Sequence, residues 1–174
     1  MWPFRKKKPE LTAEKLWGRW FRPQVPEGFP SLDAFEAAIT DDERERLPKT
    51  LAKLANDGVE RIYQVRGHDL TPDREGLVFL DELLDAEMRW KLTQDQDPAF
   101  ARNLFRLVCT EFGCVVGEIY KRTGKGTWVP QRAPNHWRSK IKLDGGADFD
   151  PFRAVVAKMS DEREPDALIA GFDG

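Results

Sequence analysis

The chain has only two cysteines, Cys109 and Cys114, in 174 residues. They are five residues apart in a segment predicted to be helical, where the axial rise between them is about 7.5 Å. A disulfide needs Cα atoms closer than about 7 Å, so an internal bridge would require the helix to break. Neither cysteine belongs to a Cys-x-x-Cys pair or has a histidine at ligand spacing. We therefore expect two free, buried thiols in a reducing cytoplasm, and no zinc site.

Long apolar runs and an excess of charge of one sign are also missing. No stretch approaches the roughly 18 apolar residues that a membrane helix needs, and the basic start of the chain is not followed by the apolar segment of a secretory signal. The 28 Lys and Arg nearly balance the 30 Asp and Glu, which gives a net charge of −2. A non-specific nucleic-acid binder is usually strongly basic. These absences predict a cytoplasmic protein with no transmembrane segment and argue against a dedicated nucleic-acid binder, so that any such contact would have to be local.

The size and composition of the chain predict one domain. A chain of 174 residues, 40% apolar and 33% charged, suits a single hydrophobic core. We predict a basic flexible N-terminal tail over 1–10, a single domain over 11–160 and an acidic C-terminal tail over 161–174, loose apart from Leu168 and Ile169. The cations Arg5–Lys8 are typical of a solubilising terminus, and weak attachment to an anionic membrane or to nucleic acid is the alternative.

Helix start signals precede apolar residues at helical spacing at several places. The helix that begins after Thr40 has a capping-box pattern with Glu43. We expect it to restart or kink at Pro48 and to stop near Gly58. The longest helix is predicted from Asp97 to about 122. The full set of such starts is Thr12, Ser31, Thr40, Thr71, Asp97 and Asp150.

The remaining segments predict a helix and a small sheet. Residues 59–65 are rich in β-formers and predict a strand, and Thr71 before Pro72 predicts a helix through about Leu92, with Glu82, Asp85 and Arg89 on a solvated side. Strands over 127–131 and around 137–143 would pair as a hairpin. The pattern therefore predicts an α+β fold that is mainly helical, with a small antiparallel sheet packed against a long central helix.

Two acidic residues fall on the apolar side of the long helix. Glu111 and Glu118 are seven residues apart, so they project in nearly the same direction, between Phe100 and Leu104. A buried carboxylate must be paired, hydrogen-bonded or protonated, because an ionised and isolated one costs several kcal/mol. The same arrangement fits a structural ion pair and a general acid or base. The partners that we expect are Arg66, His68, His136 and Arg138.

Two glycines lie between these carboxylates on the same helix. Gly113 and Gly117 are four residues apart, which predicts a small patch where a neighbouring element packs closely. A bend at Gly113 would be the alternative, and it would separate the directions of Glu111 and Glu118.

The segment HWRSKIKL alternates apolar and basic residues. Trp137, Ser139, Ile141 and Leu143 would share one face of a strand, and the other face would be a cationic stripe. Such a stripe is typical of an edge strand guarded against aggregation. It would also suit docking of an acidic protein, or of nucleic acid stacked on a tryptophan, and the near-neutral net charge favours protein. The predicted partner-binding residues are Trp137, Arg138, Lys140 and Lys142.

Catalytic signatures are weak in this sequence. Neither His68 nor His136 has a recognisable catalytic setting, the Glu-x-x-His element of di-iron bundles is absent, and RTGKGT lacks the spacing of a phosphate loop. We expect no metal and no cofactor. The enzymatic alternative is a small hydrolase-like protein that uses Glu118, with Glu111 and His136, in a cleft beside the long helix.

Gly117 and Glu118 late in a helix, followed by Gly126 and Trp128 in a strand, form a recurring pattern. It resembles small bacterial domains of unknown function that have a Gly-Glu helix and then a Gly-x-Trp strand. A hydrophobic and basic strand and the helix from Asp150 follow, so the resemblance covers roughly the C-terminal third. Some of these domains are suspected of toxin immunity. The resemblance implies a bacterial origin and an immunity-like role, and it assigns no catalytic residue.

These observations favour a non-catalytic bacterial cytoplasmic protein-binding domain. The predicted contact surface is the basic strand with the neighbouring helix end, and toxin neutralisation is one concrete form of such a role.

Overall fold

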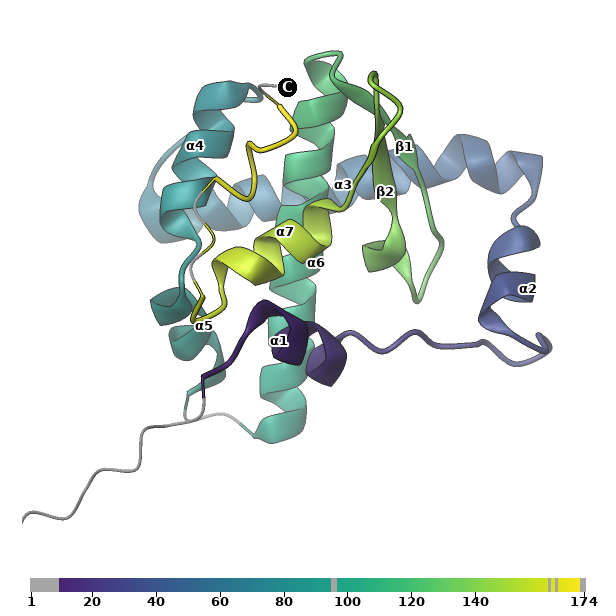
Figure 1. Cartoon of the computed structure of the whole chain (residues 1–174), viewed down its shortest axis with the longest axis horizontal. Coiled ribbons are helices and arrows are strands. Elements are labelled where there is room, and N and C mark those ends of the chain that lie inside the picture. The colour runs from purple at the N-terminus through teal and green to yellow at the C-terminus, as the bar shows by residue number, and fades with distance from the viewer. Residues whose placement is uncertain (1–9, 95–96, 163, 165, 173–174) are drawn as a thin grey trace, which may run out of the picture.

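The long helix α6 (Pro98–Arg122) lies at the centre of the molecule, as predicted. The computed structural model describes residues 10–94, 97–162, 164 and 166–172, and the fold is α+β with 59% of these described residues in helices. Helix α3 (Asp41–Arg66) crosses behind α6, and α7 (Pro151–Lys158) and α1 (Ala13–Trp20) lie in front of it (Figure 1). The other elements are α2 (Leu32–Ala37), α4 (Arg74–Leu83), α5 (Ala86–Thr93), β1 (Gly126–Val129), a 3₁₀ turn (His136–Arg138), β2 (Lys140–Leu143) and β3 (Asp148–Phe149).

Local signals at both ends explain the length of α6. The carboxylate of Asp97 accepts hydrogen bonds from the backbone N–H groups of Ala99 and Phe100, and Pro98 occupies the first turn. Two cations, Lys121 and Arg122, lie in the last turn of the helix, where their positive charge interacts favourably with the negative end of the helix dipole. Every residue from 111 to 120 is buried. Both cysteines of this helix are free and buried, as predicted, and burial raises the pKa of each thiol above its ordinary value.

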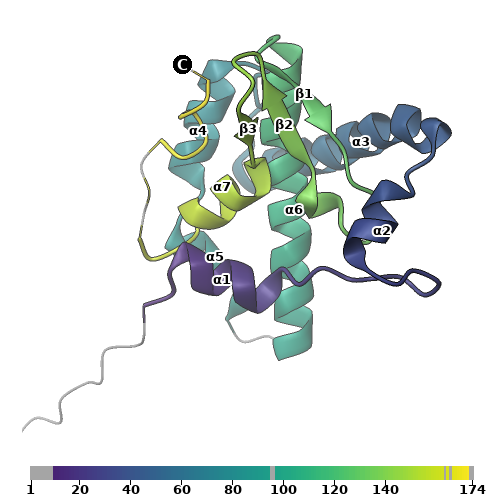
Figure 2. The ribbon, with the colours of Figure 1, turned by 45° about the vertical axis from the view of Figure 1, so that its right-hand side comes forward.

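Helix α3 corrects two predictions. It continues without interruption from Asp41 to Arg66, so the strand predicted over 59–65 is helical and Pro48 lies inside the helix. Gly58 does not end it, because this glycine is the point where α3 crosses α6. A Cβ at Gly58 would lie 2.8 Å from Cγ2 of Val115. Burial against α6 therefore outweighs the local preference of the segment for strand. Figure 2 shows the two helices crossing.

The start of α3 carries the predicted capping box. Thr40 accepts a hydrogen bond from the backbone N–H of Glu43, and the Glu43 carboxylate accepts one from the backbone N–H of Thr40. Arg132, in the connection between β1 and β2, donates to the same carboxylate at 2.9 and 3.1 Å. The hydrogen bond from Thr40 and then that from Arg132 lower the pKa of Glu43 from 4.5 to about 2.

We expect this carboxylate to stabilise the fold in a pH-dependent way. Because its pKa is lowered on folding, its contribution is complete above pH 4.5 and is lost as the pH falls toward 2. The melting temperatures of wild type and Glu43→Ala should differ by a constant amount above about pH 5 and converge at lower pH. A difference that does not change between pH 5 and pH 2 would contradict this prediction. Carbon-detected NMR of the Glu43 carboxyl reports its titration directly.

The helix predicted from Thr71 to Leu92 is two helices. Asp73 caps α4 in place of the predicted Thr71, because its carboxylate accepts from the backbone N–H of Gly76. Asp85 accepts from the backbone N–H of Met88 at 2.7 Å to cap α5. The turn between them changes the direction in which Arg89 points. Its side chain is 10% exposed and donates to the Met159 carbonyl at 2.7 Å and to Asp161 at 2.6 Å. The prediction that Arg89 belongs to a solvated side is therefore wrong.

The predicted hairpin is present and packs on the C-terminal half of α6. Strands β1, β2 and β3 form an antiparallel sheet in that order, with Trp128 opposite Ile141. Both of these side chains point toward the core. The segment that begins at His136 is a 3₁₀ turn, and the second strand starts only at Lys140.

The described end of the chain packs against the domain. Leu168 and Phe172 are buried, and the Tyr120 hydroxyl donates to the Leu168 carbonyl at 2.9 Å. The predicted N-terminal tail, with its cations Arg5–Lys8, lies outside the described residues apart from residue 10. Among the described helices, none combines the length and the hydropathy that crossing a bilayer requires.

Candidate functional site

Glu111 forms a buried ion pair with α3. Its side chain is 5% exposed. Nε and Nη2 of Arg61 donate to its two oxygens at 2.6 and 3.0 Å. Two parallel bonds of this kind are among the stronger polar contacts in proteins. The contact with Glu111 raises the pKa of the Arg61 guanidinium above its ordinary value. The carboxylate is therefore held by a structural partner.

Glu118 is held in a different way, by its own helix and the sheet. Nε1 of Trp128 donates to one carboxylate oxygen at 2.9 Å. Nζ of Lys121 lies 3.4 Å from that oxygen, and Nε of Arg122 lies 3.7 Å from the other. On the α3 side, Glu118 borders a hollow of about 140 Å³ that is also lined by Thr71.

The two carboxylates are buried and project toward the interior, as predicted, but the partners expected for them are wrong. Arg61 and Trp128 replace the expected Arg66, His68, His136 and Arg138. The error follows from the strand predicted over 59–65, because a strand does not have the helical register that aligns Arg61 with Glu111. His68 instead stacks on Phe79, with ring centroids 4.3 Å apart.

The glycine patch on α6 receives aromatic rings. A Cβ at Gly117 would lie 2.1 Å from the Trp128 ring, and one at Gly113 would lie 2.3 Å from the Phe152 ring. Tight packing at this patch is confirmed, and the helix passes through both glycines without ending. The same packing positions the indole of Trp128 to donate to Glu118.

The hydrolase prediction needed three residues around one cleft, and the structure places them apart. His136 has its Nδ1 2.8 Å from the backbone carbonyl of Gln131. It borders a hollow of about 250 Å³ whose lining residues include neither Glu111 nor Glu118. Within the described part of the chain, no three His, Cys, Asp or Glu side chains gather as metal ligands.

The basic strand presents fewer free cations than predicted. The alternation itself is confirmed at Trp137, Ser139 and Ile141, which are buried. Trp137 is 3% exposed and packs edge-on against Phe21, so it offers no stacking surface. Arg138 is paired with Glu36 at 2.6 Å, and Lys142 with Asp148 at 3.3 Å. Lys140 is exposed and has no ion pair within 4 Å among the described residues.

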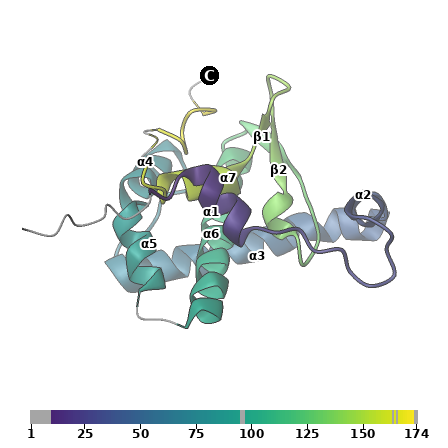
Figure 3. The same ribbon diagram turned by 60° about the horizontal axis from the view of Figure 1, so that its bottom comes forward.

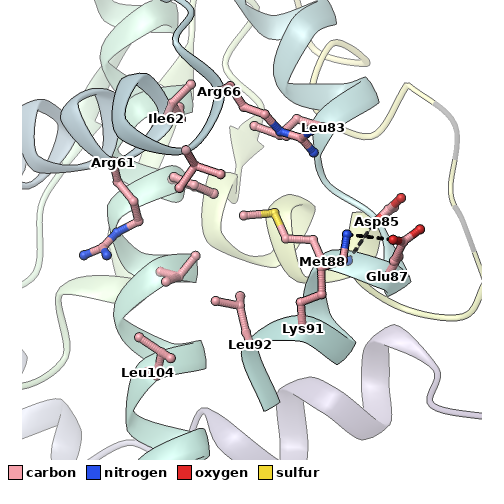
Figure 4. A pocket seen from close by; sticks show the side chains of 13 residues that line it. Arg61, Ile62, Arg66, Leu83, Asp85, Glu87, Met88, Lys91, Leu92 and Leu104 are labelled. Atoms are coloured by element: carbon pink, nitrogen blue, oxygen red, sulfur yellow. Dashed lines mark hydrogen bonds and ion pairs between the residues drawn. The ribbon is translucent and has the colours of Figure 1, made fainter. Parts of the chain in front are cut away.

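The largest of the described hollows lies between α3, α5 and α6, where no functional residue had been predicted. This α3–α5–α6 pocket has a volume of about 620 Å³. Cavities of roughly 300–1,000 Å³ with apolar walls are typical of small-ligand sites. Its apolar lining residues are Ile62, Val65, Leu83, Met88, Leu92, Leu104, Val108 and Phe112, and its charged ones are Arg61, Arg66, Asp85, Glu87 and Lys91 (Figure 4).

Most charges on the rim of this pocket are already paired. Lys91 contacts Glu87 at 2.7 Å, and Arg61 is bound to Glu111. Asp85 accepts the capping hydrogen bond from Met88. The side chain of Arg66, the last residue of α3, has no hydrogen bond or ion pair among the described residues. Asp85 has no ion pair within 4 Å among these residues either, but its carboxylate is held by the capping hydrogen bond. Arg66 is therefore the charged side chain on the rim that is left without a polar contact, and it is a cation.

A second apolar feature lies on the N-terminal half of α6, below the crossing with α3 (Figure 3). We call Phe100, Leu104 and Leu107 the α6 face. With Glu111 they follow the spacing i, i+4, i+7, i+11, so this face continues the side of α6 that packs on α3. Phe100 is 54% exposed and Leu107 is 44% exposed. Large apolar side chains at this exposure in one row indicate a contact surface.

The apolar periodicity of α6 includes these residues but does not show that Phe100 and Leu107 stay exposed. Their exposure depends on where α3 ends its contact with α6, which no local signal reports. The pocket was missed for a related reason, since it needs the true helical state of residues 59–65 and the turn between α4 and α5.

Comparison with known proteins gives no relative from which a function could be transferred. No family model matches the chain, and no significant match exists among curated proteins or solved structures. The function must therefore be inferred from the residues of this chain.

Proposed function

We propose that this protein acts by binding another protein through the α6 face, without a catalytic role of its own. Neutralisation of a toxin is one concrete form of this function. The proposal keeps the class of function that the sequence favours and moves the contact surface from the basic strand to α6.

The observation that supports it best is the exposure of the α6 face. About half of Phe100 and of Leu107 is exposed to water. The next position of the same row, Glu111, is buried against α3. Burying an apolar side chain of this size contributes roughly 1.5–3 kcal/mol. A partner that covers the row would gain this energy at both positions, in the way that aromatic and aliphatic anchors dominate protein interfaces.

One cation next to Leu107 favours an acidic partner. Arg106 borders the same hollow of about 250 Å³ as Leu107, and it has no ion pair within 4 Å among the described residues. Burial and then the charge of Arg102 lower the pKa of Arg106. A carboxylate of the partner would neutralise Arg106 and would also speed association.

The experiment compares two double variants of the whole chain. Phe100→Ser with Leu107→Ser removes the apolar row, whereas Lys140→Glu with Lys142→Glu reverses the exposed cations of the strand. We expect a stoichiometric partner captured from native cells by the wild type to bind the first variant more than about 30-fold more weakly, because each lost anchor costs about 1–2 kcal/mol. The strand variant should retain the partner.

Both variants change exposed residues, so their melting temperatures should stay close to that of the wild type. Undiminished capture by the serine variant would contradict the proposal. Loss of capture in the lysine variant alone would return the contact surface to the basic strand.

A further inference from the structure

We propose that the α3–α5–α6 pocket binds a single-chain anionic amphiphile, with its carboxylate at Arg66 and its alkyl tail among the apolar residues of the pocket. This site adjoins the α6 face and shares Leu104 with it, whereas Phe100 and Leu107 lie outside the pocket lining. The proposed ligand class is a medium-chain carboxylate, of which decanoate is the simplest example.

Opposite sides of the pocket carry different side chains. Figure 4 shows Arg66 and Leu83 on one side and Leu92 and Leu104 on the other, with Lys91 beside Leu92 and the side chain of Met88 between the two sides. A ligand that matches this arrangement has a charged head and an unbranched apolar body. Met88 suits such a site because an unbranched thioether adapts its conformation to the shape of an apolar guest.

The sign of the head group follows from the contacts on the rim. Arg61 and Lys91 are neutralised by Glu111 and Glu87. Arg66 has no such partner among the described residues, and Glu82, which shares a neighbouring hollow with it, forms no ion pair with it within 4 Å. A guanidinium binds a carboxylate through two parallel hydrogen bonds. An anionic head is therefore matched at Arg66.

The alkyl tail would bury surface that is wet in the free protein. Each methylene that moves from water into an apolar site tightens binding about fourfold. Decanoate, which has two more methylenes, should therefore bind roughly 15-fold more tightly than octanoate, provided that the tail reaches the Leu104 side. A ligand held only by charge on the surface would not show this dependence on chain length.

Methionine NMR provides the direct test, because the chain has three methionines. Met88 lines the pocket, whereas Met159 is fully buried against Cys109 elsewhere in the core. Adding decanoate below its micelle concentration to ¹³C-methyl-methionine protein should shift the Met88 signal in a saturable way and leave Met159 in place. Decanol and decyltrimethylammonium serve as probes with the same tail and a different head group.

Three variants assign the two sides of the site. Arg66→Gln, at an exposed position, should weaken the binding of decanoate about five- to tenfold and change the affinity for decanol little. Leu104→Trp should fill the tail side and abolish the Met88 shift. Leu107→Trp, on the same helix but outside the pocket lining, is the matched control and should bind like the wild type. Melting curves show whether each variant is folded.

The proposal is overturned if decanoate gives no saturable Met88 shift, or if all three head groups bind equally and Arg66→Gln has no effect. It is also overturned if decanoate fails to bind while Leu104→Trp abolishes capture of a protein partner, because the pocket would then belong to the protein interface. The double variant Phe100→Ser with Leu107→Ser should lose the protein partner but still bind decanoate like the wild type. This result would support both proposals and show that the two sites act independently.

Discussion

Replacing Gly117 with alanine should lower the free energy of unfolding by about 3 kcal/mol, although alanine is the better helix former by about 1 kcal/mol. The added methyl would lie 2.1 Å from Cζ2 of Trp128 and 2.2 Å from Cη2. The ring cannot withdraw without breaking its hydrogen bond to Glu118, which is 2.9 Å long. Loss of a hydrogen bond to a buried charged group adds about 1.5–3 kcal/mol.

Gly18→Ala is the matched control for this substitution. Gly18 lies inside α1, and a Cβ there would have no atom within 4 Å. Helix propensity then acts alone and should stabilise the protein by about 0.5–1 kcal/mol. Urea unfolding of the two variants should therefore show changes of opposite sign. A stabilised Gly117→Ala protein would mean that Trp128 does not pack on this position.

Removing Arg61 should have the second large effect. Arg61→Met leaves the Glu111 carboxylate, 5% exposed, without its two hydrogen bonds. Breaking a buried pair from one side in this way costs about 3–5 kcal/mol. Glu111→Met should cost less, about 1–2 kcal/mol, because the Arg61 side chain is 35% exposed and can turn toward water.

The double variant distinguishes an ion pair from simple packing. Arg61→Met with Glu111→Met leaves no unpaired charge, so its stability should lie closer to the wild type than that of Arg61→Met alone. Chemical unfolding of all four proteins gives the coupling energy. Additive losses would show that the two side chains do not interact as the structure indicates.

The wrong predictions have a common physical origin. Residues 59–65 have strand propensity and follow a glycine, and both local signals indicate that the helix stops at Gly58. The packing of Gly58 against Val115 reverses this outcome, since the absence of a side chain allows α3 to cross α6 closely. Once α3 continues, Arg61 faces Glu111, and one side of the α3–α5–α6 pocket is formed.

The basic strand is a second case in which a local pattern predicted burial but not the partners of the charged residues. Alternation of apolar and basic residues correctly gave the buried side, with Ser139 and Ile141 in the core. It could not show that Glu36, about a hundred positions earlier in the chain, neutralises Arg138. Ion pairs between distant segments depend on tertiary proximity, which alternation within one strand does not encode.

The sequence by itself determined where helices begin, because capping acts over three or four residues. The helices predicted from Thr12, Ser31, Thr40, Asp97 and Asp150 are capped by these residues, and only at the predicted start Thr71 is the cap two residues further on, at Asp73. It also determined that the two cysteines are free and that Glu111 and Glu118 share a buried side of one helix, since helical periodicity is a local property. The tertiary structure alone decided where α3 ends, which partners hold the carboxylates, and which apolar residues of α6 stay exposed. Each of these depends on contacts between segments far apart in the chain, where burial of apolar surface outweighs local conformational preference.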